Sequence, residues 1–167
     1  ALLGENGSGK STLMNILSGI YLPDAGEIAI HGERVVFRSP RDSMKKGIGM
    51  IHQHFKLVEN LTALDNIVAG TGHGLLFDRK AARAKVVALS EKFDMDIDPD
   101  RQVAVMSVSE KQKVEILKVL YRGSQILILD EPTAGLTPQE ITRLFNSLHR
   151  MRENGQAVVF ISHKLNE

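Results

Sequence analysis

The chain has 167 residues, of which 43% are apolar, and this length and composition suit a single domain with a sizeable core. Lys and Arg number 21 against 20 Asp and Glu, so a net charge of +1 gives no electrostatic reason to expect nucleic acid or an anionic membrane as the main partner. Cysteine and tryptophan are absent and aromatic residues make up 5%, which excludes disulfides, thiolate metal sites and Cys nucleophiles and argues against a base-stacking platform.

The first third of the chain reads as short strands around one helix, because brief apolar runs alternate with glycine-containing turns. We expect, in order, a strand end, a glycine-rich turn, a helix, two short antiparallel strands and a further strand, at residues 1–3, 4–9, 10–17, 27–30, 34–37 and 47–51. Gly19 and Pro23 end the helix, and the last strand leads to Gln53.

The middle of the chain changes to helical composition. Helices are predicted over residues 62–69, 78–93 and 109–121, and the glycines at 70, 72 and 74 form a joint between the first two.

The last third returns to strands. Ile126–Leu129 and Ala157–Ile161 are continuous apolar runs, which are typical of strands buried on both faces. They flank a helix predicted over 137–151, which Thr137 caps and Pro138 opens. Strand, helix, strand in this order predicts an α/β fold with a mainly parallel sheet.

A phosphate-binding loop follows the first strand. Its sequence Gly4-Glu5-Asn6-Gly7-Ser8-Gly9-Lys10-Ser11 matches the pattern G-x-x-x-x-G-K-S/T. Glycines let backbone N–H groups converge on phosphate oxygens, and the helix N-terminus adds partial positive charge. Lys10 can reach the β- and γ-phosphates, and the Ser11 hydroxyl can bind Mg²⁺. The segment from Gly4 to Thr12 therefore predicts a site for a nucleoside triphosphate with Mg²⁺.

Two acids end the strand over 126–129. An acid at the carboxyl end of a parallel strand faces the ligand crevice. We expect Asp130 to hold Mg²⁺ and Glu131 to polarise the attacking water as general base.

Taken in order, these motifs resemble the ATP-binding cassette (ABC) family, specifically its ATPase subunits. Gln53 follows a strand, and Met106-Ser107-Val108-Ser109-Glu110 precedes a helix, where the signature motif L-S-G-G-Q of the family lies. Asp130-Glu131 and then His163 complete the order. The resemblance covers essentially the whole chain. It implies a P-loop NTPase fold with a small antiparallel β subdomain and a helical insert, and ATP with Mg²⁺ as cofactors.

The resemblance also implies roles by position. Gln53 resembles the Q-loop glutamine, which contacts Mg²⁺ or water, and His163 resembles the switch histidine, which contacts the γ-phosphate. Ser107 and Ser109 resemble the segment that meets ATP bound to a partner cassette. Either serine could instead simply cap its helix.

Two positions depart from the family pattern. Ser109 stands where the signature has its second glycine, and a side chain there would weaken contact with the ATP of a partner. Thr137 stands where the D-loop usually has Asp, although sugar-type members resemble this chain there and at Val108. The resemblance therefore implies that the nucleotide site of this chain is intact. It leaves open whether the segment with Ser107 and Ser109 contacts the ATP of a partner cassette.

Two other clusters could suggest metals. His52 and His54 flank Gln53 without a third ligand nearby in sequence. The aspartates at 94, 96, 98 and 100 alternate like a calcium loop but lack its Gly and terminal Glu. We expect no metal at the histidines and a solvated loop at the aspartates.

Three segments, 49–55, 120–123 and 133–140, narrow the resemblance to ATPases of simple-sugar and nucleoside importers, with a lean toward nucleosides. In that subfamily two cassettes lie in tandem, and this chain resembles the first. The implied partners are a second cassette, membrane permease subunits and, indirectly, a solute-binding protein, at the cytoplasmic face of the plasma membrane and without nucleic acid. No run approaches the roughly 20 apolar residues that span a bilayer, so any membrane link would run through another chain.

We expect one ABC ATPase domain over 1–167, truncated at both ends, with its core at about 1–60 and 123–167 and a helical insert at about 61–122. The predicted function is to bind and hydrolyse ATP and so energise import of a small solute. The alternatives are a weakly hydrolytic regulatory cassette, which Ser109 favours, a non-transport ABC ATPase, and a fragment that is not a functional unit by itself. Balanced charge and the lack of a long coiled coil argue against the non-transport types.

Overall fold

The computed structural model describes residues 2–4, 7–71 and 77–162. Four parallel strands form one sheet in the order β1-β6-β5-β4, and β2 and β3 form a separate antiparallel sheet. The strands are β1 Leu2–Leu3, β2 Ile28–Ile30, β3 Glu33–Val35, β4 Ile48–Ile51, β5 Ile126–Asp130 and β6 Ala157–Ser162. The helices are α1 Lys10–Leu17, α2 Pro40–Lys45, α3 Ala63–Val68, α4 Arg79–Lys92, α5 Val108–Tyr121 and α6 Pro138–Glu153, with a 3₁₀ turn η1 at Val103–Val105.

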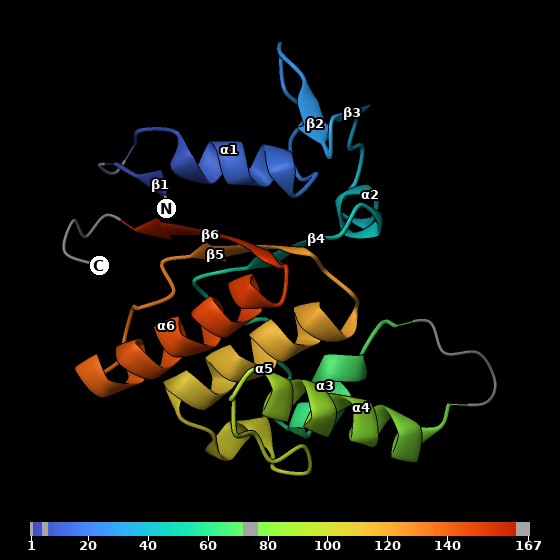
Figure 1. Cartoon of the computed structure of the whole chain (residues 1–167), viewed down its shortest axis with the longest axis vertical. Coiled ribbons are helices and arrows are strands. Elements are labelled where there is room, and N and C mark those ends of the chain that lie inside the picture. The colour runs from blue at the N-terminus through green and yellow to red at the C-terminus, as the bar shows by residue number, and fades with distance from the viewer. Residues whose placement is uncertain (1, 5–6, 72–76, 163–167) are drawn as a thin grey trace.

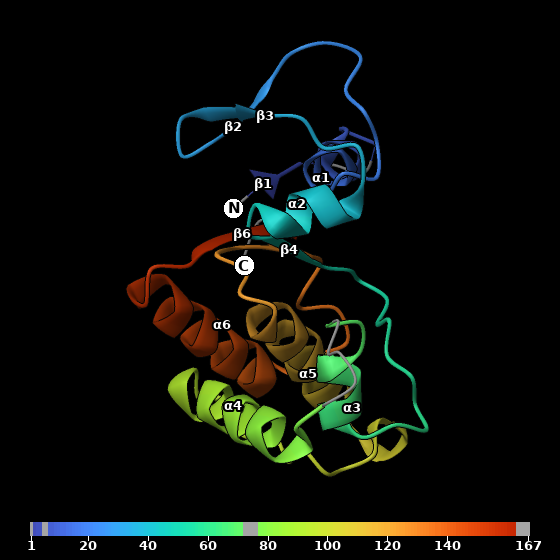
Figure 2. The same cartoon turned by 90° about the vertical axis from the view of Figure 1, so that its right-hand side faces the viewer.

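The parallel sheet is covered on both faces (Figures 1 and 2). The helix α1, the β2–β3 hairpin and α2 lie on one side of it, and α5 and α6 lie on the other, with α3 and α4 beyond them. Side chains of a strand alternate between faces. Leu127 and Leu129 accordingly belong to the core cluster that includes residues of α5 and α6, while Ile128 belongs to the cluster that includes Met14 of α1. Burial on both faces explains why β5 is a continuous apolar run.

The predicted α/β P-loop NTPase fold is confirmed, with differences at element bounds. The strand predicted over 34–37 is β3, Glu33–Val35, and the buried Phe37 lies beyond it. The helix predicted over 137–151 continues to Glu153. The division into core and insert stays a prediction.

Helix α2 was not predicted, because six residues are too few to show a helical period. Its signal is local: Ser39 precedes Pro40 at the first helical position. The Asp42 carboxylate accepts hydrogen bonds from the Ser39 hydroxyl at 3.0 Å and the Arg38 N–H at 3.1 Å.

The aspartate-rich loop is solvated as predicted. Asp94, Asp96, Asp98 and Asp100 are exposed, and the residues between them are buried in the core. Within the described ranges, no helix is both long and apolar enough to cross a membrane.

Candidate functional site: a nucleotide cavity

The sheet brings the separated motifs to one edge. All four of its strands run parallel, so their carboxyl ends lie together. The phosphate loop follows β1, Asp130 ends β5, and Gln53 lies two residues after β4. One cavity of about 300 Å³ is lined by Gly7, Gly9, Lys10, Ser11, Thr12, Gln53, Asp130, Glu131 and Ile161. The structure therefore assembles the residues predicted for phosphate, Mg²⁺ and water.

The phosphate loop depends on glycine at two positions. Gly7 and Gly9 have φ values of 85° and 86°, in the left-handed region that side chains rarely adopt. Gly9 is also the N-cap of α1, and no side-chain hydrogen bond caps this helix within the described residues. Because the first N–H groups of a helix have no partner inside the helix, this N-terminus suits an anion.

Lys10 is held by the loop that it belongs to. Its Nζ donates to the Gly4 carbonyl at 2.6 Å and to the Ser8 hydroxyl at 3.3 Å. A Cβ at Gly4 would lie 2.8 Å from the Ser8 Oγ, so a larger residue there would displace the Ser8 hydroxyl that accepts from Lys10. The ammonium group therefore stands at the cavity with loop oxygens as its partners.

Asp130 and Glu131 form the acidic side of the cavity. Burial, followed by the charge of Glu131, raises the pKa of the half-buried Asp130 above its ordinary value, while His52 and Lys10 act in the opposite direction. Glu131 has a φ of 49°, uncommon outside glycine, and its N–H donates to the Ile161 carbonyl at 3.1 Å. A strained backbone at this point turns the chain out of β5 with both carboxylates at the cavity.

Gln53 lines two neighbouring pockets. The exposed Gln53 lines the nucleotide cavity and also a groove of about 330 Å³, whose other lining residues are His54, Phe55, Leu57, Glu59, Val103 and Lys111. Burial, followed by the charge of Lys56, lowers the pKa of the neighbouring His52.

The oxygen donors in the cavity fit Mg²⁺. The Ser11 hydroxyl, the Asp130 carboxylate and the Gln53 amide supply the hard oxygen ligands that Mg²⁺ prefers, usually together with phosphate and water. Among the described residues, no group of three or more His, Cys, Asp or Glu side chains could hold a metal ion. The site therefore suits a metal shared with phosphate rather than one held in a protein cage.

Ser107 and Ser109 do not line this cavity. Ser107 caps α5: its hydroxyl accepts from the Glu110 N–H at 3.2 Å, and its own N–H donates to the Glu110 carboxylate at 2.8 Å. Ser109 lines a small hollow between α5 and α6 with Met95, Gln112 and Leu144 among its neighbours. Their contact with the nucleotide of a partner stays a prediction.

Glu5, Asn6 and His163 lie outside the described residues, so the roles predicted for them also stay predictions.

Sequence reasoning missed two polar residues near the site. Gln112 and Glu115 are 5% and 6% exposed on α5, and their side chains bond backbone groups close to Glu131 and Gln53. The sequence carries one signal for them: both lie at helical spacing among apolar residues, which points to the inward face of the helix but not to the group that each residue bonds.

Comparison with known proteins decides the family. Residues 1–134 match the family model described as ABC transporter. The chain belongs to the ABC transporter family. The nucleoside import ATP-binding protein NupA of Lactococcus lactis is 48% identical over 169 residues, covering 100% of this chain and 33% of that protein. The ribose import ATP-binding protein RbsA of Caldanaerobacter subterraneus is 45% identical over 170 residues, covering 100% of this chain and 34% of its own length.

This ABC chain thus spans about one third of the length of the curated relatives it matches. Among solved structures, it is similar to the dimeric structure of MJ0796, a bacterial ABC transporter cassette, with a TM-score of 0.80 and 25% identity. The match covers 99% of this chain and 74% of the other. The family resemblance drawn from the sequence motifs is confirmed.

Proposed function

We propose that this chain binds and hydrolyses ATP and thereby energises import of a small solute through partner membrane subunits. The observation that carries the proposal is the single cavity that collects Lys10, Ser11, Gln53, Asp130 and Glu131 from three separated parts of the chain. Triphosphate hydrolysis needs these groups together: a cation, oxygen ligands for Mg²⁺, and a base for water.

Binding would use the phosphate loop and the uncapped N-terminus of α1. Phosphate oxygens would accept hydrogen bonds from the loop N–H groups and from Lys10, whose ammonium group would give up loop oxygens for phosphate. Ser11, Asp130 and Gln53 would hold Mg²⁺, which neutralises phosphate charge when bound. We propose ATP rather than GTP as the nucleotide, because the similar relatives are named ATP-binding proteins.

Hydrolysis would follow from the position of Glu131 at the end of β5. Its carboxylate would accept a proton from water as the water attacks the γ-phosphorus in line. Lys10 and His163 would stabilise the charge that develops on the transferring phosphoryl group.

A second cassette would complete the site. Ser107 and Ser109 of this chain would face the nucleotide bound to the second cassette, and the equivalent segment of that cassette would face the nucleotide in the cavity of this chain. The dimeric cassette structure supports a cassette partner. The groove shared by Gln53 and Phe55 is the surface that we expect to meet a membrane permease subunit at the cytoplasmic face of the membrane. A nucleoside or simple sugar, delivered by a solute-binding protein, is the expected cargo, because relatives of both kinds align over the whole chain.

The test is uptake by the full-length protein assembled with its permease subunits in liposomes. Labelled nucleoside and labelled ribose should be taken up only when ATP is present on the cassette side. ATP hydrolysis that remains independent of every solute and permease would contradict import and support a non-transport ATPase.

A weakly hydrolytic regulatory cassette is the alternative that Ser109 favours. It predicts tight ATP binding with almost no turnover in the assembled complex. Ser109→Gly should then raise the ATPase rate several-fold, whereas an active importer with a tolerated serine would change little.

A further inference from the structure

Two polar side chains of α5 are buried on the face that packs against the rest of the protein. Gln112 is 5% exposed and Glu115 is 6% exposed, among inward apolar neighbours such as Val114 and Ile116. Burying an amide or a carboxylate is unfavourable unless hydrogen bonds compensate. Their partners therefore indicate what these two residues do.

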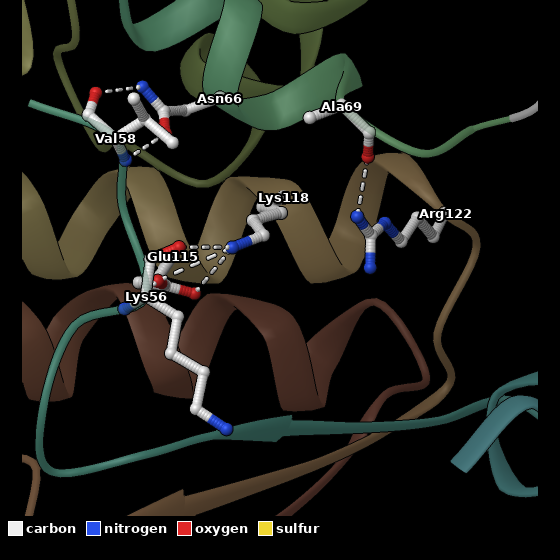
Figure 3. A network of polar contacts seen from close by, with 7 residues as sticks. All are labelled: Lys56, Val58, Asn66, Ala69, Glu115, Lys118 and Arg122. Atoms are coloured by element: carbon white, nitrogen blue, oxygen red, sulfur yellow. Dashed lines mark hydrogen bonds and ion pairs between the residues drawn. The ribbon is translucent and has the colours of Figure 1, made fainter. Parts of the chain in front are cut away.

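Glu115 holds the segment that follows Gln53 (Figure 3). Its carboxylate accepts a hydrogen bond from the Lys56 N–H at 2.7 Å. Lys118, one turn along α5, donates to the Lys56 carbonyl at 3.1 Å and pairs with Glu115 at 3.3 Å. Both backbone polar groups of Lys56, three residues after Gln53, are thus fixed by one turn of α5.

The same segment is held further along by α3, which packs beside α5. Asn66 of α3 accepts from the Val58 N–H at 2.7 Å and donates to the Val58 carbonyl at 3.0 Å. Arg122, which follows α5, donates to the Ala69 carbonyl at 2.7 Å and so ties the end of α3 to the end of α5 (Figure 3). The chain after Gln53 consequently cannot shift relative to α5 without breaking several hydrogen bonds.

Gln112 holds the segment that follows Glu131. Its side-chain N–H donates to the Pro132 carbonyl at 2.5 Å. Pro132 comes directly after Glu131, whose left-handed backbone is uncommon and needs support from its surroundings. The hydrogen bond therefore restrains the turn that carries the Glu131 carboxylate.

We propose that Glu115 and Gln112 are positioning residues for ATP hydrolysis, Glu115 acting through Gln53 and Gln112 acting through Glu131. Both residues project from α5, whose N-cap is Ser107. The helix therefore fixes the positions of Gln53 and Glu131 relative to the segment that we propose meets the nucleotide of a partner. This inference rests on the proposed ATPase function and adds to it the residues that keep Gln53 and Glu131 in position.

The first experiment compares Glu115→Ala and Glu115→Gln in the full-length transporter in liposomes. Glu115→Ala removes the acceptor of the Lys56 N–H, and we expect kcat to fall about tenfold, because small misplacements of catalytic groups are costly. The affinity for ATP should stay within about twofold, since phosphate contacts of Lys10 are untouched. Glu115→Gln keeps an acceptor oxygen and should recover most of kcat.

The second experiment tests whether Glu115 acts through Gln53. In a Gln53→Ala background, Glu115→Ala should cause no further loss of kcat, because coupled residues are not additive. Equal losses in both backgrounds would overturn the proposal for Glu115. Gln112→Ala should lower kcat and alter the acidic limb of the kcat–pH profile, which reports the general base. An unaltered limb would overturn the proposal for Gln112.

Ser90→Ala is the matched control. Ser90 is also buried, and its hydroxyl accepts from the Ile97 N–H at 3.2 Å, far in sequence from the cavity residues. It should lower the melting temperature as Glu115→Ala does while leaving kcat unchanged. If Lys10→Ala retains turnover, the ATPase proposal itself fails. If Lys10→Ala is inactive but Glu115→Ala behaves like Ser90→Ala, only the positioning role fails.

Discussion

We propose that two helix N-termini in this protein meet phosphate, that of α1 in its own cavity and that of α5 in the cavity of a partner, and they are built in opposite ways. At α1 the N-cap is Gly9, no acidic residue lies in the first turn, and no side chain caps the helix within the described residues. At α5 the N-cap Ser107 and Glu110 form a reciprocal capping box. The first N-terminus is suited to bind an anion directly, whereas at the second the capping box already satisfies the backbone N–H groups of Ser107 and Glu110.

The difference implies that the N-termini of α1 and α5 have different roles. Glu110 also places a negative charge in the first turn of α5, where it pairs with Arg101 and would repel a phosphate. We therefore expect the α1 site to bind nucleotide without help from a partner. The α5 segment would contribute only when a partner presents ATP together with its own compensating charges.

Removing the cation beside α1 should have the largest effect. We expect Lys10→Ala to weaken ATP binding about 100-fold, or about 3 kcal/mol, as for loss of a charged hydrogen-bond partner. Calorimetric titration of the full-length protein measures this, with Lys80→Ala on the exposed side of α4 as control. Equal affinities in the two variants would mean that the α1 end is not the phosphate site.

Removing the N-cap side chain of α5 should lower the stability of the folded protein and leave its affinity for ATP unchanged. Ser107→Ala should cost about 1 kcal/mol and lower the melting temperature by about 3 °C. Thr137→Ala is a matched control, because Thr137 and Glu140 form the same capping box on α6. Both variants should lose similar stability, and only Ser107→Ala should slow ATP turnover in the assembled complex. Equal turnover in both would leave Ser107 as a cap alone.

Asp130 gives a pH-dependent test of the acidic side of the α1 cavity. Its raised pKa means that the folded state holds a proton more tightly than the unfolded state, so stability falls as pH rises above 3.8 and through the folded pKa. Asp130→Asn should therefore raise the melting temperature at pH 7, with the gain shrinking as pH falls toward 3.8.

Asp42→Asn should behave in the opposite way. Hydrogen bonds from Ser39, followed by the Arg38 N–H, lower the pKa of Asp42, so its ionised form stabilises the folded state above pH 3.8. The variant should melt lower than the wild type at neutral pH. Parallel shifts in the two variants, read from melting curves over a pH series, would refute the electrostatic account of Asp130.

The smallest effect is expected from the charge at α5. Glu110→Gln keeps an oxygen for the Ser107 N–H but removes the negative charge, and turnover of the assembled complex should rise about twofold. Glu140→Gln makes the same change on α6 and should leave the ATPase rate unaltered. A fall in rate for Glu110→Gln would show that the capped end favours catalysis as it stands.

The sequence was sufficient to predict the cavity because its residues belong to local motifs. The phosphate loop is one continuous segment, and Asp130 and Glu131 end a recognisable buried strand. The rule that parallel strands share a carboxyl edge then places them together, which the cavity confirms.

The supporting contacts could not be predicted in the same way. Glu115 meets the Lys56 N–H across 59 positions, and Gln112 meets the Pro132 carbonyl across 20. A sequence indicates that such side chains are polar, but it does not indicate which distant backbone group lacks a partner. The helix α2 was missed for a different reason: it is too short to show a hydrophobic period, and its start is fixed by the hydrogen bonds of Asp42.

The most direct test of the ATPase site is a comparison of ATP binding and phosphate release by full-length Glu131→Gln and wild type. We predict that the variant binds ATP with wild-type affinity, because Lys10 and the phosphate loop are intact, and that phosphate release falls at least about 100-fold through loss of the base. Phosphate release at the wild-type rate would contradict the assignment of Glu131 and, with it, the claim that this cavity performs the chemistry.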